Sequence, residues 1–363
     1  MMTKRRCPAL FAMSLVLAVT AAAAACAKRP AGPSYETLRA AFADPPAAYR
    51  SAPLWAWNDD MTREEIRRQL GEFKARGIGG AFIHPRPGLV TPYLSDEWFS
   101  LCAYAVEAGK ELGLKIWLCD ENFYPSGFAG GHVPASMPDA VRSGLRMRTF
   151  QGPPPAAALE PAPLAVLRRT LAGLEDVTGR ALPAGGDASA YYVFDVVRQP
   201  PSPRHGGFAY ADPLRKDVTE KFLDLTLNGY KRVIGAEFGR TVPGVFQDEA
   251  EIGPAGGRDA VNYTPALFQA FRGRWGYDLR PNLVSLFEET GAWRRVRHDF
   301  YAVLLDLFLE NWAKPYYAYA TENGLVFTGH YWEHEWPRPR VSPDNLEIGR
   351  ATSELQSQNA ISY

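Results

Sequence analysis

The fold is set by two short stretches, which read Trp117-Leu-Cys-Asp120-Glu121-Asn-Phe-Tyr-Pro125 and Val242-Pro-Gly-Val-Phe-Gln-Asp248-Glu249-Ala-Glu251. Each begins as an apolar run of strand type and ends abruptly in carboxylates that are followed by loop residues. In parallel α/β folds, ligands bind at the carboxyl ends of the strands. Acidic residues at two such ends therefore predict a pocket built from carboxylates, which suits either glycosidic hydrolysis or metal binding.

Around these stretches, short apolar strands alternate with amphipathic helices, at the spacing of about 25 to 35 residues that a (β/α) barrel requires. Thr62 and Ser95 are predicted to cap the helices between the first three strands. This alternation predicts an α/β fold, a (β/α)8 TIM-type barrel that is truncated after about five strands. The expected strands lie at 54–57, 79–84, 114–119, 242–246 and 325–328.

The alternation is interrupted between the third and the fourth strand. Residues 152–163 are rich in proline, and residues 190–197 alternate between apolar and polar positions as a strand does. We therefore expect residues 147–211 to form an inserted β-rich subdomain or a long excursion. The barrel units would then occupy residues 50–146 and 212–346.

The amino terminus has the pattern of an export signal. A basic segment and an apolar stretch fill residues 1–25, which predicts a signal peptide, and three alanines precede Cys26. This arrangement resembles a bacterial lipobox, so lipidation of Cys26 would make residues 26–49 a lipidated tether and linker. An ordinary signal peptide cut near Ala25 is the alternative. Either case predicts an exported protein, as an outer-membrane lipoprotein held by its lipid anchor or in the periplasm.

The last 17 residues, 347–363, do not have the pattern of a native protein segment. Residues 347–363 back-translate into successive parts of a common short-read sequencing adapter. The pattern predicts that the gene is truncated near Leu346 and that this tail is an artefact. We expect the chain to be inactive by itself.

Composition argues against some function classes. Lys and Arg together number 40, and Asp and Glu also number 40, so no basic surface indicates nucleic acid as a partner. Two cysteines fall within the predicted barrel, Cys102 in a helix pattern and Cys119 in a strand pattern. A disulfide between them is one option in an exported protein, but buried free thiols are favoured.

Several motifs together resemble bacterial proteins related to family 106 glycoside hydrolases, a family that includes α-L-rhamnosidases. The resemblance covers about residues 50–345, the amino-terminal part of such a barrel enzyme. It implies a barrel fold, a glycosidase reaction with inversion and a carbohydrate substrate, and it allows Ca²⁺ at residues 248–251. Glu249 stands where the rhamnosidase pattern has a small hydroxyl residue. The resemblance therefore implies the fold and the reaction class more strongly than the identity of the sugar. The motifs are residues 53–58, 77–80, 117–131, 248–253, 262–265 and 276–278.

Glycosidic cleavage needs a protonated carboxyl near the leaving oxygen and a second carboxylate for water or the anomeric carbon. Glu249 and Glu251 both follow the fourth strand, and period-two alternation would place them on one face, with Asp248 pointing away. Their mutual repulsion would raise the pKa of one of them, so either is a candidate acid. Glu333, after the fifth strand, is the candidate base.

Other polar and aromatic side chains at the strand ends are candidates for holding the sugar. No cysteine and histidine spacing suggests zinc, so Ca²⁺ is the only metal considered, and its ligands stay unknown. A non-catalytic carbohydrate-binding lipoprotein on a degenerate barrel is the alternative function. The complete set of carboxylates favours the enzyme. The substrate-binding candidates are Trp57, His84, Asp120, Glu121, Asp248, His330 and Trp332.

Overall fold

The computed structural model describes residues 32–183 and 188–331, so Cys26, Trp332 and Glu333 lie outside the described residues. The chain divides into two compact units, Met1–Pro46 and Ala47–Tyr363. In the described part of the first unit, helix α2 (Tyr35–Ala43) is capped by Ser34, whose hydroxyl accepts a hydrogen bond from Thr37 N at 3.2 Å. None of the described helices combines the length and apolar character needed to cross a membrane.

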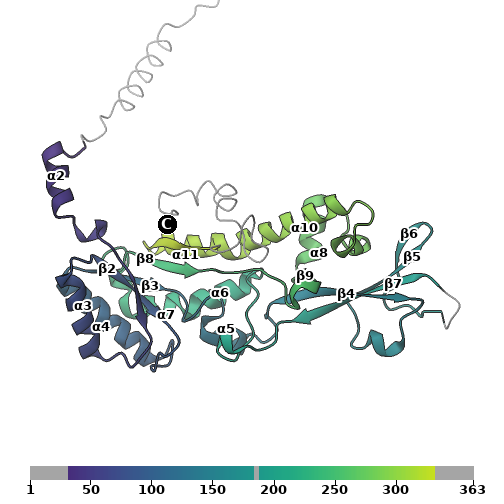
Figure 1. The fold of residues 1–363 in the computed structure, drawn as a ribbon, viewed down its shortest axis with the longest axis horizontal. Helices are drawn as coiled ribbons and strands as arrows, with labels where there is room; N and C mark the ends of the chain where they lie inside the picture. The colour runs from purple at the N-terminus through teal and green to yellow at the C-terminus, as the bar shows by residue number, and fades with distance from the viewer. Residues whose placement is uncertain (1–31, 184–187, 332–363) are drawn as a thin grey trace, which may run out of the picture. The chain divides into compact units, whose positions relative to one another are not determined.

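The second unit is built on a parallel sheet of five strands in the order β1-β2-β3-β8-β10 (Figure 1). All of its neighbouring strands are parallel, and the sequence predicted all five of them. A closed barrel is not shown, because the described residues form an open sheet. The strands are β1 (Leu54–Trp57), β2 (Gly80–Pro85), β3 (Lys115–Cys119), β8 (Gly244–Asp248) and β10 (Val326–His330).

The first two helices of this unit begin where side chains cap them. Helix α3 (Arg63–Ala75) starts after Thr62, whose hydroxyl accepts from Glu65 N at 3.2 Å. Helix α4 (Asp96–Leu112) starts after Ser95, which accepts from Trp98 N at 3.1 Å. Gly113 ends α4 with a φ of 71°, a left-handed conformation that glycine adopts without strain. Both predicted caps are confirmed.

The two faces of the parallel sheet differ in burial. One face packs against α4 and neighbouring helices such as α7 (Leu227–Ile234), and its side chains are almost completely buried. This is the principal core of the unit, and it also contains Cys102. Cys102 and Cys119 are both buried free thiols, and Cys119 pairs in register with Phe246 on the opposite face of the sheet. The buried side chains on this face include Trp55, Trp57, Ile83, Ile116, Leu118 and Val245.

The opposite face of the sheet is only partly covered in the described residues. The parallel register places Phe82 beside Trp117, and their rings stack with centroids 5.0 Å apart. Phe246 meets Phe82 edge to face at 5.9 Å. The same face also carries His84, Asp248 and His330 at the carboxyl ends of their strands, because register partners share a face.

A second, antiparallel sheet lies beyond the parallel one (Figure 1). Its order is β6-β5-β7-β4-β9. The sequence predicted an inserted segment at 147–211, whereas this sheet begins at Ser143 and takes its edge strand β9 from the chain after β8. Its strands are β4 (Ser143–Gln151), β5 (Ala165–Thr170), β6 (Gly173–Asp176), β7 (Ala190–Arg198) and β9 (Ala260–Tyr263).

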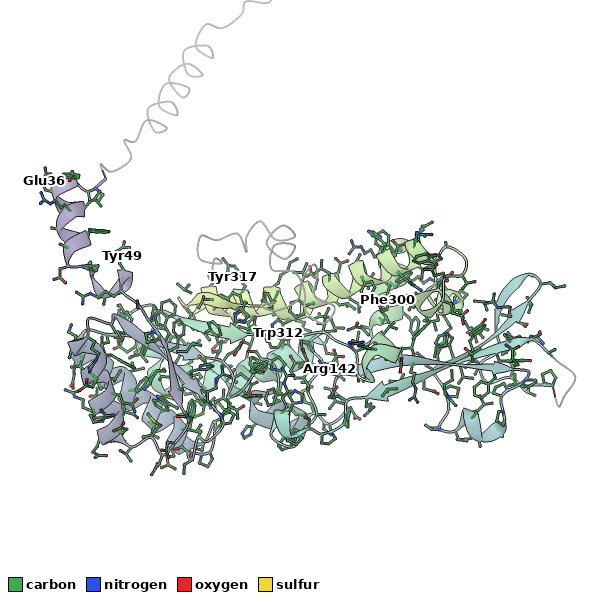
Figure 2. All side chains as sticks on the ribbon, viewed as in Figure 1. Glu36, Tyr49, Arg142, Phe300, Trp312 and Tyr317 are labelled. Atoms are coloured by element: carbon green, nitrogen blue, oxygen red, sulfur yellow. The ribbon has the colours of Figure 1, made fainter. Side chains whose placement is uncertain are left out.

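Helices fill the rest of the second unit. A long run consists of α10 (Trp293–Phe308), a π-helical turn (Leu309–Ala313) and α11 (Lys314–Glu322), and it includes the fully buried Trp312 (Figure 2). Thr219 is completely buried inside α6, which starts at Lys216. The remaining α-helices are α5 (His132–Ser136), α6 (Lys216–Leu225), α8 (Leu267–Trp275) and α9 (Val284–Phe287).

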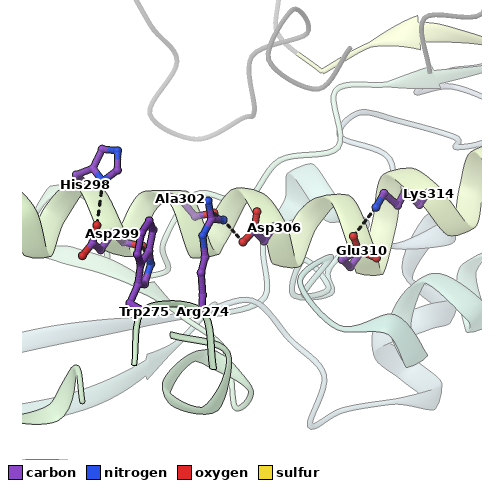
Figure 3. A network of polar contacts seen from close by, with 8 residues as sticks. All are labelled: Arg274, Trp275, His298, Asp299, Ala302, Asp306, Glu310 and Lys314. Carbon is purple, nitrogen blue, oxygen red and sulfur yellow. Dashed lines mark hydrogen bonds and ion pairs between the residues drawn. The ribbon is translucent and has the colours of Figure 1, made fainter. Parts of the chain in front are cut away.

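Polar contacts join α8 to this long run, as Figure 3 shows. The indole N–H of Trp275 donates to the carbonyl of Asp299 at 3.0 Å, and Arg274 forms an ion pair with Asp306. The Asp299 carboxylate contacts Nδ1 of His298 at 2.9 Å. The contacts of Trp275 and Arg274 hold α8 against α10, whereas the contact of His298 with Asp299 lies within α10.

The close pairing of β8 with its neighbours makes Gly244 intolerant of a side chain. A Cβ there would lie 2.2 Å from the Val326 carbonyl oxygen and 2.6 Å from Trp117. We predict that Gly244→Ala lowers the free energy of unfolding by about 1–3 kcal/mol, measured by urea unfolding. The control is Gly273→Ala on an exposed stretch of α8, where nothing lies within 4 Å and the stability should rise by up to about 1 kcal/mol. Equal effects at the two positions would contradict the described register.

Candidate active site at the strand ends

Five polar side chains from three strands meet at the carboxyl edge of the parallel sheet. His330 lies opposite Asp248 in the register of β10 and β8, and its Nε2 is 3.6 Å from Asp248 Oδ1. Arg86 Nη2 and His84 Nε2 approach Asp248 Oδ2 at 3.7 and 4.0 Å. Glu249 Oε1 is 3.5 Å from His330 Nε2. We refer to these five residues as the strand-end cluster.

Asp248, a predicted substrate-binding residue, is the centre of the cluster, and it approaches the same histidine as Glu249 instead of pointing to the other side from it. Strand β8 continues through Asp248 rather than stopping at Phe246. The side chains of Phe246 and Asp248 therefore lie on the same face of the sheet. The side chain of Asp248 is 15% exposed, low enough for strong electrostatic contacts and still reachable by a ligand.

Glu249 has a strained backbone. Its φ is 54°, in the left-handed region that a residue with a side chain enters at a cost of about 1–2 kcal/mol. Its N–H donates to the carbonyl of His330 at 2.9 Å, which holds this conformation. Strained residues of this kind concentrate at functional sites, where the surrounding structure fixes them.

Glu251 does not join Glu249, and the predicted pairing of these two residues is wrong. The left-handed turn at Glu249 ends the alternation of the strand. Glu251 forms an ion pair with Arg142, whose guanidinium also donates to Gln199 at 3.2 Å and lies over the Tyr210 ring at 5.0 Å. Glu251 therefore links the loop after β8 to the base of the antiparallel sheet.

Asp120, at the end of β3, is completely buried beneath the cluster. Its carboxyl accepts hydrogen bonds from the Ser126 hydroxyl at 2.6 Å and the Tyr316 hydroxyl at 2.9 Å. Burial raises the pKa of Asp120 to about 8, against these two hydrogen bonds. The raised pKa predicts that Asp120 takes up a proton as the pH falls below about 8. Its burial excludes direct contact with a sugar in this structure.

Glu121 is enclosed by its own loop. Its two oxygens accept five backbone N–H groups, including those of Ala129 and Gly130 at 2.6 Å. Burial and the neighbouring Asp120 raise the pKa of Glu121 to about 8, whereas the N–H donors favour its charged form. The side chain is 3% exposed, so its position is that of an anchor for the loop at 122–131.

Trp57, one of the two predicted stacking residues, does not lie at the strand ends. Trp57 is fully buried in the core, where it meets Trp55 and Trp98 edge to face, so no ring face is left for a sugar. Phe123 and Tyr124 in the loop after β3 are partly exposed instead. Both rings lie 5.9 Å from the guanidinium of Arg86, which borders Asp248. Trp332 and Glu333, also predicted for the site, are among the residues not described.

One member of the cluster, Arg86, and one neighbour, Ser126, were not predicted from the sequence, although the sequence contains a signal for each. Arg86 follows His84 and Pro85 directly at a strand end, where a basic side chain beside an acidic pocket is informative. Ser126 follows Pro125 in the quoted loop, and its hydroxyl bonds both Asp120 and the N–H of Asp248. Only the fold could show that these residues meet.

The neutral state of His84 suits a polar, uncharged ligand. Burial and the nearby Arg86 lower the pKa of His84 to about 4, so its imidazole is neutral at pH 7. A neutral imidazole can donate one hydrogen bond and accept another, as a sugar hydroxyl requires. Within 32–183 and 188–331, no group of three or more candidate side chains could hold a metal ion.

A cavity of about 330 Å³ lies elsewhere, where the antiparallel sheet meets the segment that precedes α6. Asp212, Arg198 and Tyr263 are among its lining residues, and no member of the strand-end cluster is. This cavity is therefore separate from the strand-end cluster.

No model of a known protein family matches the sequence, and no curated protein matches it. Among solved structures, the chain is similar to a rhamnosidase from Novosphingobium sp. PP1Y, with a TM-score of 0.58 and 16% identity. The similarity covers 84% of this chain and 48% of that protein, so the chain spans about half the length of its structural relative. At this identity the likeness shows a rhamnosidase-like fold and nothing finer.

The raised pKa of Asp120 predicts a loss of stability with rising pH. In the folded state Asp120 keeps its proton up to about pH 8, whereas the ordinary pKa of the group is 3.8. The proton therefore stabilises the folded state fully below about pH 4, and this stabilisation is lost as the pH rises toward 8. Asp120→Asn removes the titration, and we expect its free energy of unfolding to fall less between pH 5 and pH 8 than that of the wild type. Urea unfolding at both values measures this. The exposed Asp60→Asn should follow the wild type, and a parallel dependence in Asp120→Asn would refute the predicted proton uptake by Asp120.

The five N–H groups around Glu121 predict a strong requirement for both of its oxygens. In Glu121→Gln an amide NH₂ would face backbone donors, so we expect the free energy of unfolding to fall by about 1–3 kcal/mol. The exposed Glu322→Gln is the control, with a change within about 0.5 kcal/mol. Unchanged stability of Glu121→Gln in thermal and urea unfolding would show that the loop does not depend on this carboxylate.

Proposed function

We propose that the protein is a glycoside hydrolase whose active site includes the strand-end cluster. The observation that carries this proposal is the meeting of Asp248 and Glu249 around His330 at the carboxyl edge of a parallel sheet. Such edges hold the active sites of parallel α/β enzymes, and paired carboxylates are the equipment of glycosidic cleavage. The rhamnosidase-like fold supports the same reaction class.

The two carboxylates are suited to different roles. Glu249 is the proposed general acid, which protonates the leaving oxygen as the glycosidic bond breaks. Asp248 Oδ2 lies 3.7 Å from Arg86 Nη2, and we assign the Asp248 carboxylate to stabilising the positive charge that develops on the sugar ring. Glu333 stays the proposed base that takes a proton from water. Its assignment rests on the sequence alone.

The finer features of the function are proposed from the sequence pattern and the fold. An α-L-rhamnoside is the first substrate to test, because both the resemblance to family 106 and the structural relative suggest it. Phe123 and Tyr124 beside Arg86 are the proposed apolar surface for the sugar ring. We further propose export, with Cys26 as the lipidated residue that anchors the protein to a membrane.

Catalysis by Glu249 predicts a dependence on the leaving group. A general acid matters most when the leaving oxygen is basic, so Glu249→Gln should lose roughly 10²-fold or more in kcat/KM on methyl α-L-rhamnoside. The loss on 4-nitrophenyl α-L-rhamnoside should be much smaller, because nitrophenolate leaves without protonation. Initial rates of the full-length gene product on the two substrates measure the difference.

Glu251→Gln is the comparison variant, since Glu251 pairs with Arg142 outside the cluster. We expect it to affect both substrates equally, through stability. A selective loss in Glu251→Gln rather than Glu249→Gln would transfer the acid role to Glu251. A full-length protein that binds sugars but hydrolyses no aryl glycoside would instead support the non-catalytic carbohydrate-binding lipoprotein.

A further inference from the structure

We propose that Ser126 is the positioning residue for the carboxylates of the strand-end cluster, a role that rests on the proposed function. Ser126 is completely buried in the loop after β3. Its N–H donates to the Asp248 carbonyl at 2.7 Å, and its hydroxyl oxygen accepts from the Asp248 N–H at 2.8 Å. The same hydroxyl donates to Asp120 Oδ1 at 2.6 Å.

These bonds make Ser126 a substitute strand partner for Asp248. The pairing of β3 with β8 reaches only Cys119 and Phe246, followed by one bond from Asp120 N to the Phe246 carbonyl at 3.1 Å. Beyond that point β3 no longer runs beside β8. Ser126 then satisfies both backbone groups of Asp248, with a hydroxyl in the place of the carbonyl that a neighbouring strand would offer.

Ser126 can take the place of a strand partner because its own polar groups are all hydrogen-bonded. Asp120 orients the Ser126 hydroxyl, since that hydroxyl can donate only one hydrogen bond. The Ser126 carbonyl accepts from the Tyr210 hydroxyl at 2.6 Å, and this phenol also accepts the Glu251 N–H at 3.4 Å. Every polar group of Ser126 is therefore engaged, which fixes its position relative to β8.

The bond to Asp248 matters because the next residue is strained. His330 holds the Asp248–Glu249 segment from the β10 side, and Ser126 holds it from the β3 side. A left-handed residue persists only where its surroundings fix it, so losing one side would let Glu249 relax. The carboxylates of Asp248 and Glu249 would then move relative to each other, and displacements of this kind can reduce a rate by roughly 10²-fold.

The test compares Ser126→Ala with Ser285→Ala in the full-length protein. Ser285 is also a buried serine, and its hydroxyl donates to the Thr290 carbonyl at 2.9 Å without contacting the cluster. Two measurements are needed. Hydrogen–deuterium exchange of residues 244–250, without substrate, reports the support of β8, and steady-state kinetics on the aryl rhamnoside report kcat and KM separately.

We expect Ser126→Ala to exchange roughly tenfold faster or more over residues 244–250. It should also lower kcat by roughly 10-fold to 100-fold with KM nearly unchanged. Ser285→Ala should lose comparable stability without either effect. Wild-type kcat in Ser126→Ala, or a lowered kcat with unaltered exchange, would overturn the positioning role. If the wild type hydrolyses no glycoside, the proposed function fails, while the exchange measurement still decides whether Ser126 supports β8.

Discussion

The parallel register of β8 between β3 and β10 is the constraint on which the site depends. It sets Asp248 opposite His330 and brings the end of β2 within reach of the same carboxylate. Because neighbouring residues in register share a face, a slip of one residue would turn Asp248 toward the helices and Gln247 toward the cluster. The glycine at position 244, which lets the backbones approach, therefore contributes to the site as well as to the core.

Burial of the acidic loop after β3 is the second requirement. Isolated carboxylates are expensive to bury, and the structure offsets this cost in two different ways. Asp120 has a raised pKa and two hydroxyl partners, whereas Glu121 receives a shell of backbone N–H groups. Asp120 is connected to the strand-end cluster through Ser126, and Glu121 holds the loop that carries Ser126. The ion pair of Arg142 and Glu251 extends this support to the antiparallel sheet, so both sheets contribute to one network.

The strands and helix caps of the parallel sheet could be predicted because their signals are local. Short apolar runs predict β1, β2 and β3, and a serine or threonine before each helix predicts its cap. Both kinds of signal can be recognised from residues that are close in the sequence. The meeting of His84, Asp248 and His330 followed from the rule that strand ends converge. The partners of Glu251 could not be foreseen, since Arg142 lies 109 residues away. The burial of Trp57 and the recruitment of β9 also depend on contacts between distant segments.

The backbone N–H groups around Glu121 suggest a way to engineer the ligand specificity of the site. One side chain organises the loop through backbone N–H groups, so the hydrogen bonds do not depend on which side chains the other loop positions carry. Gly130 and Gly131 cannot carry other side chains, because a Cβ would lie 2.8 Å from Tyr93 at position 130 and 2.2 Å from Phe208 at position 131. A library that keeps Glu121 and the loop glycines while randomising Phe123 and Tyr124 would therefore vary the rim of the site on an unchanged frame.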